Sequence, residues 1–468
     1  MTTYIKQKLN DSPVARWSVL VFISFTMFCA YFITDVMAPL MEDLGTEFGW
    51  DAADFGMFNF SYMWINVFLF MLIIGGMILD KIGVRMTGVL SCIAMLIGCF
   101  IKYYAVANPE VFSGEILGLK SQLFVACIGY AIFACGLEMA GITATKSIAR
   151  WFTGHEMALA MGLQVAVARI GTALALSAAL PLAKYFGSLS TPILMGLVGL
   201  AIGLVSFLVF CVMDKKLEKS MGEVDEKPDE PFKVSDIVLI IKNKGFWLLA
   251  LLCVLFYSAV FPFLKYAVSL MTNKYGVDPE LAGTIPAMLP IGAIFLTPFF
   301  GGVYDKIGKG VTLMMTGALL LVVVHFLFAM PLLNVWWFAA FLMILLGIAF
   351  SLVPSAMWPS VPKIIPQNQL GTAYGLIFWV QNIGLGAVPL LIGWVLSKYC
   401  IIGTKTEIVE VTKNGITEMV EKTTTLYDYT LPMLIFATFG ILALFVAYLL
   451  KREDTRKNYG LEKPNIKK

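Results

Sequence analysis

Two residues of opposite charge lie deep within long apolar segments of this sequence. Glu138 lies 12 residues before Arg150, and Arg169 lies 13 residues after Glu156. A polar break separates the apolar segment of Glu138 from that of Arg169. At a helical rise of about 1.5 Å per residue, the two side chains lie about 18 and about 20 Å from one face of a membrane. A charge at that depth costs at least about 2.5–3.5 kcal/mol, so it is normally paired or lines a path for water.

A carboxylate and a guanidinium at one depth allow two interpretations. The Arg169 side chain could hold a ligand carboxylate through two parallel hydrogen bonds while Glu138 binds an ammonium group. Alternatively, the two side chains form a structural ion pair between neighbouring helices. The internal repeat described below places Ser351 and Asn382 at the corresponding positions of the second half. The repeated frame therefore does not require charges there, which favours the ligand role.

The composition places these segments in a membrane. Of 468 residues, 59% are hydrophobic and 14% are charged, against about 45–50% and about 25% in soluble domains. The apolar residues form blocks of 20 or more, such as residues 17–41 and 246–271, long enough to cross a hydrocarbon core of about 30 Å. The net charge of +3 comes from 34 basic and 31 acidic residues, which argues against nucleic acid as a partner.

The blocks and the breaks between them predict an all-α polytopic membrane protein with twelve transmembrane helices. These cover residues 17–41, 54–79, 84–107, 119–150, 156–184, 189–213, 245–272, 280–303, 309–331, 334–362, 369–398 and 429–450. We expect an N-terminal six-helix bundle at 1–213, a polar cytoplasmic linker at 214–244 and a C-terminal six-helix bundle at 245–468. A polar insert at about 401–428 carries Asn414-Gly415 between alternating apolar residues, which predicts an external β-hairpin.

The basic residues predict the orientation of the chain. With the N-terminus inside, the inside segments carry 24 of the 34 Lys and Arg and the outside segments carry 8. Lys and Arg are retained on the cytoplasmic side, so both termini are expected there. The first apolar block is too long for a cleavable signal peptide. No predicted external loop carries a glycosylation sequon, which favours a bacterial inner membrane over a lysosomal membrane.

A short motif occurs twice, at corresponding places in the two halves. The first copy, after the second predicted helix, consists of Gly76, Asp80, Lys81, Gly83 and Arg85. The second copy, 225 residues later, consists of Gly301, Asp305, Lys306 and Gly308. In the second copy Gly310 follows Lys309 without an equivalent of Arg85. Duplicated halves of this kind are typical of transporters, in which the substrate site lies at their interface.

The motif Gly-x-x-x-Asp-Lys-x-Gly-x-Arg resembles the signature loop of the major facilitator superfamily, and the resemblance covers nearly the whole chain. It implies two pseudo-symmetric six-helix bundles that work by alternating access. We expect the charged motif residues to lock helix ends at a cytoplasmic gate, with Arg150 as the partner of Asp80. The alternative is that these charges serve only to orient the chain, because short inside loops are basic in any case.

A closer resemblance rests on two short motifs around the buried charges. Glu138-Met-Ala-Gly in the fourth helix and Ala168-Arg-Ile-Gly in the fifth resemble the lysosomal dipeptide uniporter branch of the superfamily. This resemblance implies that Glu138 meets the amine of a peptide and Arg169 its carboxylate.

Further candidates follow from position within the predicted helices. Asp35 and Lys265 occupy equivalent positions in the first and seventh helices, near their outer ends, so we expect them to pair as an external gate. The alternative is that both side chains extend to the membrane interface. Polar residues within helices are candidates for the substrate cavity, although hydrogen bonds between helices would also explain them; they are Asn59, Tyr62, Trp379, Gln381 and Asn382.

Other functional classes find little support in the sequence. There is no His-Glu-x-x-His, no Gly-x-Ser-x-Gly and no phosphate-binding loop that ends in Gly-Lys-Ser/Thr. The eight cysteines lie in or at the end of apolar blocks, which argues against a zinc site. We therefore expect no enzyme activity and no cofactor. The sequence predicts an alternating-access transporter of small zwitterionic solutes, with dipeptides favoured. The alternative is a proton-coupled carrier of small organic anions or sugars, with Glu138 as the proton site.

Overall fold

The computed structural model describes residues 9–152, 155–221, 234–331, 333–366, 369–413 and 416–464. Eleven helices in these residues are long and apolar enough to cross a membrane. One of them, α5 (Met71–Ala107), combines the end of the second predicted helix with the third, because its backbone is non-helical at Gly83 (φ 78°, ψ 168°). The predicted twelve-helix fold is confirmed, with this turn as the boundary between two crossings.

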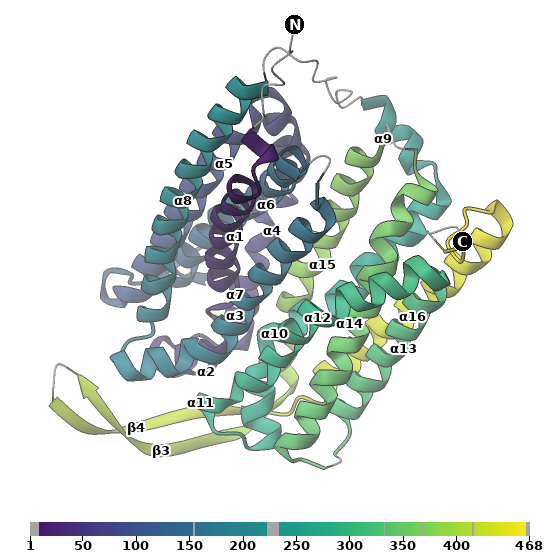
Figure 1. Cartoon of the computed structure of the whole chain (residues 1–468). Coiled ribbons are helices and arrows are strands. Elements are labelled where there is room, and N and C mark those ends of the chain that lie inside the picture. Colours follow the sequence, from purple (N-terminus) through teal and green to yellow (C-terminus); the bar gives the residue numbers. More distant parts are fainter. Residues whose placement is uncertain are drawn as a thin grey trace, which may run out of the picture.

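The first half of the chain forms one group of helices, drawn from purple to teal in Figure 1. After the 3-10 turn η1 (Leu9–Asp11), its elements are α1 (Pro13–Asp35), η2 (Ala38–Leu40), α2 (Met41–Phe48), α3 (Ala52–Phe60), α4 (Tyr62–Asn66), α5, η3 (Pro109–Val111), β1 (Glu115–Ile116), β2 (Leu119–Lys120), α6 (Ser121–Phe152), α7 (Met157–Phe186) and α8 (Thr191–Met221). The second predicted crossing is thus divided among α3, α4 and the start of α5.

The second half forms a group of helices beside the first, drawn in green and yellow in Figure 1. Its elements are α9 (Val234–Ile241), α10 (Lys244–Tyr275), α11 (Pro279–Ala282), α12 (Thr284–Ile307), α13 (Gly310–Ala329), α14 (Trp336–Ile364), α15 (Leu370–Tyr399), β3 (Ile401–Lys413), β4 (Ile416–Tyr427) and α16 (Thr430–Lys457).

The polar segment between the halves begins later than the sequence suggested. The helix α8 continues to Met221, so Asp214 lies within a helix rather than at the start of a linker. Residues 234–241 form the short helix α9, and residues 222–233 of the predicted linker lie outside the described part of the chain. Apolarity ends near Asp214 because the helix leaves the hydrocarbon region there, while its backbone hydrogen bonds continue.

Small residues allow the helix that carries Glu138 to pack closely on its neighbour. A Cβ atom on Gly98 of α5 would lie 2.3 Å from the backbone nitrogen of Phe133, and one on Gly129 of α6 would lie 2.6 Å from the backbone nitrogen of Lys102. Glycines at helix contacts in membranes permit this close approach of two backbones. They fix α6 against α5 and so set the position of the Glu138 side chain.

The two halves are in close contact at the end of the molecule that carries the β-hairpin, here called the hairpin end. A Cβ on Gly56 of α3 would lie 2.7 Å from the carbonyl oxygen of Pro389 in α15. The backbone nitrogen of Ala53 donates to the hydroxyl of Ser397 at 2.8 Å. A Cβ on Gly283 would lie 1.8 Å from the Leu176 carbonyl oxygen. Any larger side chain at these glycines would push the halves apart.

The strands β3 and β4 form an antiparallel hairpin, with Ile401 paired to Tyr427 and Lys413 to Ile416; the predicted turn Asn414-Gly415 lies outside the described residues. In Figure 1 the hairpin leaves the second half and runs past α2 of the first half. The backbone nitrogen of Tyr427 donates to the side chain of Asn273 at 2.9 Å. Burial raises the pKa of Tyr427 to about 12, so its hydroxyl stays neutral.

Candidate substrate site

A cavity of about 560 Å³ lies between the two halves and is lined by residues of both. Its volume is within the range of about 300–1,000 Å³ that is usual for small-molecule sites. Of the residues expected from the sequence to bind substrate, Asn59, Tyr62, Glu138, Arg169 and Gln381 line it. The charged pair predicted for an external gate, Asp35 and Lys265, also contributes to the lining.

The carboxylate of Glu138 on α6 is held by neutral hydrogen-bond donors. The Tyr62 hydroxyl of α4 donates to its Oε1 atom at 2.8 Å. The amide nitrogen of Asn382 on α15 lies 3.4 Å from the same oxygen. Asn382 belongs to the second half of the chain, so this carboxylate is a point of contact between the halves. These donors orient Glu138 without neutralising its charge.

The guanidinium group of Arg169 on α7 lies among aromatic rings. Its central carbon is 5.5 Å from the ring centre of Tyr31, 5.0 Å from Phe261 and 5.6 Å from Phe350. Within the described part of the chain, no carboxylate oxygen lies within 4.0 Å of its nitrogens. The structural ion pair with Glu138 that the sequence left open is therefore not formed among these residues.

Asp35 and Lys265 are in direct contact across the two halves. The Nζ atom of Lys265 on α10 lies 2.7 Å from Oδ1 of Asp35 and 2.8 Å from the carbonyl oxygen of Thr34 on α1. Both charged side chains are 12% exposed. The structure thus brings together the two residues that the sequence placed at equivalent positions, near the hairpin end. It does not place them apart at the membrane interface.

A third intramembrane cation, Lys102 of α5, was missed by the sequence analysis. Its side chain is fully buried, its Nζ donates to the Ile33 carbonyl oxygen at 3.0 Å, and it lies 5.2 Å from the ring centre of Tyr130. Lys102 and Lys265 both bind backbone carbonyl groups in the last turn of α1, where the helix dipole favours a positive charge. In the sequence it is only a single lysine near the end of a predicted helix. That position does not tell whether the side chain is buried or exposed at the membrane interface.

The remaining predicted cavity residues differ in their contacts. The Asn59 side chain donates to the Phe55 carbonyl in its own helix at 2.9 Å. Gln381 accepts from the thiol of Cys253 at 3.4 Å. Trp379 is not among the described residues that line the cavity; its indole nitrogen donates instead to the Val67 carbonyl at 3.1 Å.

Trp379 contacts the second predicted crossing at the point where the helix of that crossing is interrupted. Phe70, between α4 and α5, has a left-handed backbone (φ 54°), and its ring stacks on Trp379 at 5.6 Å. Trp379 therefore ties α15 to this interruption rather than lining the cavity.

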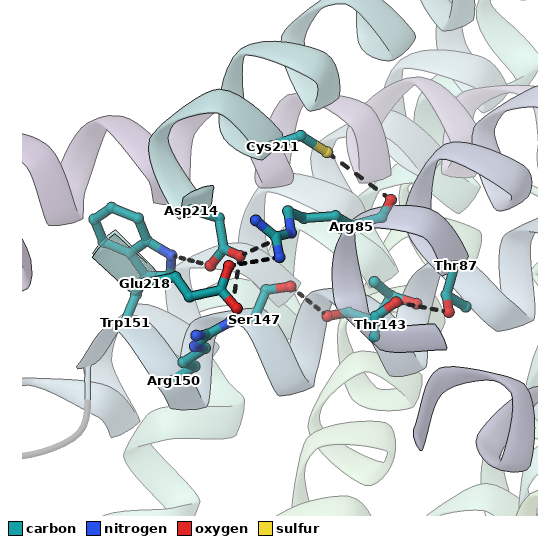
Figure 2. A network of polar contacts seen from close by, with 10 residues as sticks. Arg85, Thr87, Thr143, Ser147, Arg150, Trp151, Cys211, Asp214 and Glu218 are labelled. Atoms are coloured by element: carbon teal, nitrogen blue, oxygen red, sulfur yellow. Dashed lines mark hydrogen bonds and ion pairs between the residues drawn. The ribbon is translucent and has the colours of Figure 1, made fainter. Parts of the chain in front are cut away.

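At the end of the first half that lies opposite the hairpin end, several charged residues surround a buried carboxylate (Figure 2). Asp214 of α8 is fully buried. It accepts hydrogen bonds from the Trp151 indole at 3.0 Å and from Arg150 at 3.3 Å, and Arg85 lies 3.7 Å away. Arg85 also contacts Glu218 at 2.6 Å. Asp214 was not among the predicted residues, because it seemed to begin the linker.

The predicted pairing of Asp80 with Arg150 is replaced by other contacts. Oδ1 of Asp80 accepts from Lys146 at 2.6 Å, while Arg150 binds Asp214 on α8. Lys81 is exposed at the turn. The turn itself requires Gly83, because a φ of 78° with a ψ of 168° is accessible almost only to glycine.

The second copy of the motif is covered by the C-terminal segment. Asp305 and Lys306 lie in the last turn of α12. The following turn binds Glu462, whose carbonyl accepts from the Lys309 backbone at 2.9 Å and whose carboxylate accepts from the Thr312 backbone at 2.9 Å. The side-chain carboxylate of Glu462 therefore binds the chain beside the second copy of the motif, whereas the charges around Asp214 lie beside the first copy.

Curated relatives cover most of the chain. The lysosomal dipeptide transporter MFSD1 of Danio rerio is 28% identical over 394 residues, which is 81% of this chain and 80% of the relative. The Homo sapiens protein of the same name is 27% identical over 391 residues, with 81% of this chain and 80% of the relative covered.

Solved structures share the fold at lower identity. A bacterial homologue of the human lysosomal transporter Spinster, inward-facing and unoccupied, has a TM-score of 0.70 at 14% identity and covers 95% of this chain and 98% of its own. The inward-open xylose transporter XylE of E. coli has a TM-score of 0.65 at 14% identity, with 92% and 96% covered.

The family model described as Major Facilitator Superfamily matches residues 23–389. This match includes the first copy of the Asp-Lys motif, the central cavity residues Glu138 and Arg169, and most of the second half. The chain belongs to the major facilitator superfamily and is a multi-pass membrane transporter rather than an enzyme.

Proposed function

We propose that this transporter carries dipeptides, with Arg169 binding the carboxylate and Glu138 the ammonium group of the substrate. The observation that carries the proposal is that both charges reach one central cavity without neutralising each other. Arg169 is held by rings, and Glu138 is held by neutral donors. A zwitterionic ligand would supply the missing counter-charge to both.

A dipeptide is long enough to bridge the two charges, which do not contact each other. An extended chain spans about 3.3–3.6 Å per residue, so the ends of a dipeptide lie about 7 Å apart. Such a ligand can bridge two groups that do not contact each other. The lysosomal dipeptide transporters to which the chain is similar support the same choice at about 28% identity.

We propose further that the hairpin end is external and closed, and that the cavity is reached from the cytoplasm. The excess of Lys and Arg on the side of the termini supports this orientation. The six-helix groups at 1–213 and 245–468 would then rock about the cavity, and opening the hairpin end would separate Asp35 from Lys265. The motif charges at Asp80, Lys81, Arg85, Arg150, Asp305 and Lys306 would serve the cytoplasmic gate. A bacterial inner membrane is the proposed location.

A second candidate is a proton-coupled carrier of small organic anions or sugars. It is favoured by one observation: within the described residues, Glu138 has no cationic partner, so it is placed to accept and release a proton. Acidification outside proteoliposomes separates the two candidates. Uptake that is indifferent to a pH gradient supports facilitated movement, and strong acceleration by external acid supports coupling.

Ligand-induced stabilisation of the purified protein tests the proposed substrate class. Dipeptides, free amino acids, dicarboxylates and sugars are compared at increasing concentration for the native chain and for Arg169→Ala. A ligand at about 100 times its Kd adds about 2.7 kcal/mol to the folded state. We expect stabilisation by dipeptides alone and its loss in the variant. Arg456→Ala is the matched control, because Arg456 is 62% exposed and is not among the described residues that line the cavity.

A further inference from the structure

The second half contributes a cluster of contacting aromatic side chains to the cavity wall. Tyr257 and Phe261 of α10 and Phe350 and Trp358 of α14 all line it. Their rings contact one another, with centres 5.4 Å apart for Tyr257 and Phe261, 5.5 Å for Phe261 and Phe350, and 6.4 Å for Tyr257 and Trp358. These four residues are called the aromatic wall. Together they form a ring surface that the second half contributes to the cavity.

The aromatic wall leaves little polar surface of its own. The indole nitrogen of Trp358 donates to the Tyr257 hydroxyl at 3.1 Å, so the one N–H donor of the wall already has an acceptor. The other two members are phenylalanines. Burial of apolar surface against such a wall contributes about 25 cal/mol per Å², and aromatic pairs at centre distances of about 4.5–7 Å add to this. The group that fits the wall is an aliphatic or aromatic side chain.

The aromatic wall is joined to Arg169 rather than to Glu138. Phe261 and Phe350 each lie within 5.6 Å of the guanidinium carbon, whereas Glu138 contacts Tyr62 and Asn382. A cation over a ring gains about 0.5–2 kcal/mol without using a hydrogen bond. The N–H donors of Arg169 therefore remain available for a carboxylate beside the wall.

We propose that the aromatic wall is the subsite for the side chain of the carboxyl-terminal residue of the dipeptide. This inference rests on the proposed function and deepens it. The carboxylate and the side chain of the last residue share one Cα atom, so a carboxylate on Arg169 places that side chain against Phe261 and Phe350. The side chain of the amino-terminal residue lies toward Glu138, away from the wall. Dipeptides that end in an apolar residue are the preferred substrates.

The test compares the Kd values of Gly-Phe, Phe-Gly and Gly-Gly for the full-length protein in detergent. Because one methylene in a hydrophobic pocket changes affinity by about tenfold or more, Gly-Phe should bind at least about tenfold more tightly than the other two. Trp358→Ala shortens the wall at a residue that does not contact Arg169 in the described structure. It should weaken Gly-Phe by more than it weakens Gly-Gly, so that the preference of the native chain for Gly-Phe over Gly-Gly shrinks.

Phe299→Ala is the matched control, because Phe299 is 62% exposed on α12 and does not line the cavity. It should change none of the three Kd values. If Trp358→Ala does not fold, the three ligands on the native chain still decide the question. Equal affinity for Gly-Phe and Phe-Gly overturns the subsite and leaves the dipeptide proposal intact. Failure of all three to bind, with binding of an organic anion or a sugar, overturns both.

Discussion

The Nζ atom of Lys265 lies 2.7 Å from Oδ1 of Asp35, and this ion pair joins α10 of the second half to α1 of the first. The same lysine also binds the carbonyl of Thr34. The pair is nearly buried and connects the two halves at the hairpin end. Its loss should therefore destabilise the conformation in which that end is closed. Removing this contact is the simplest test of what holds the hairpin end closed.

Lys265→Met should loosen the hairpin end. Removing one partner of a buried ion pair costs about 3–5 kcal/mol, because the other charge stays buried and unpaired. Hydrogen–deuterium exchange at the C-terminal end of α1 and around residue 265 of α10 should therefore speed up, and adding Asp35→Asn should restore part of the protection. Lys398→Met, an exposed lysine at the same end, is the control. Unchanged exchange in Lys265→Met would show that the pair does not hold this end closed.

Gly393→Ala should disfavour the same closed state for a steric reason. A Cβ there would lie 2.2 Å from the Ala52 carbonyl oxygen in the opposite half, and backbone atoms cannot move aside without separating α3 from α15. Overpacking costs about 1–3 kcal/mol, so transport should fall by about five- to a hundredfold if the closed state is on the cycle. Gly375→Ala on the same helix meets no atom of the described residues within 4 Å and should be neutral. Equal transport by both variants would refute the argument.

Asp214→Ala should destabilise the first half at its opposite end. The carboxylate is buried and bound by Arg85, Arg150 and Trp151, so its removal takes away the acceptor of the Trp151 indole and the buried negative charge beside both arginines. We expect a loss of about 3 kcal/mol, the lower end for buried pairs, because both arginines keep some contact with water. Glu218→Ala removes a 53% exposed carboxylate and should cost under about 1 kcal/mol. Equal unfolding temperatures for the two variants would contradict the central position of Asp214.

Gly83→Ala should weaken the turn between the second and third crossings. The strain comes from the backbone, since an added Cβ would have no described atom within 4 Å at this position, while the conformation itself costs a larger residue about 1–3 kcal/mol. Gly76→Ala is matched to it, because Gly76 is helical and also has open space around it. Thermal unfolding should be lowered only by Gly83→Ala. A similar shift in both variants would mean that backbone strain is not the cause.

The membrane-spanning helices were predictable because each must be long enough to cross the hydrocarbon core. The break at Val67–Phe70 was not, since nothing in that apolar block marks a left-handed residue at Phe70. The end of α8 was misplaced because the residues after Cys211 become charged while the helix continues to Met221. Hydropathy reports where a helix leaves the membrane, and hydrogen bonding decides where it ends.

The candidate site was predictable only in its charged residues. Glu138 and Arg169 stand out because charges are rare at that depth. The rings that hold Arg169 do not stand out among 35 phenylalanines, and Phe261 and Phe350 are 92 and 181 residues away from it in the chain. Their contact depends on how the two halves pack. The partners of Asp80 and Arg150 likewise depend on the packing of α6 against α5 and α8.

The central claim, that Arg169 binds the carboxylate and Glu138 the ammonium group, is tested most directly by modified ligands on matched variants. Kd values are measured for one dipeptide, its C-terminal amide and its N-acetyl form, with the native chain, Arg169→Gln and Glu138→Gln. The native chain should prefer the unmodified dipeptide by about tenfold or more, as expected for charged groups left without partners.

Each variant should then lose one preference and keep the other. Arg169→Gln should bind the dipeptide and its amide equally while still rejecting the N-acetyl form. Glu138→Gln should bind the dipeptide and its N-acetyl form equally while still rejecting the amide. If either variant keeps the preference that it is expected to lose, or if the native chain does not distinguish the three ligands, the two charges do not bind the ends of the substrate.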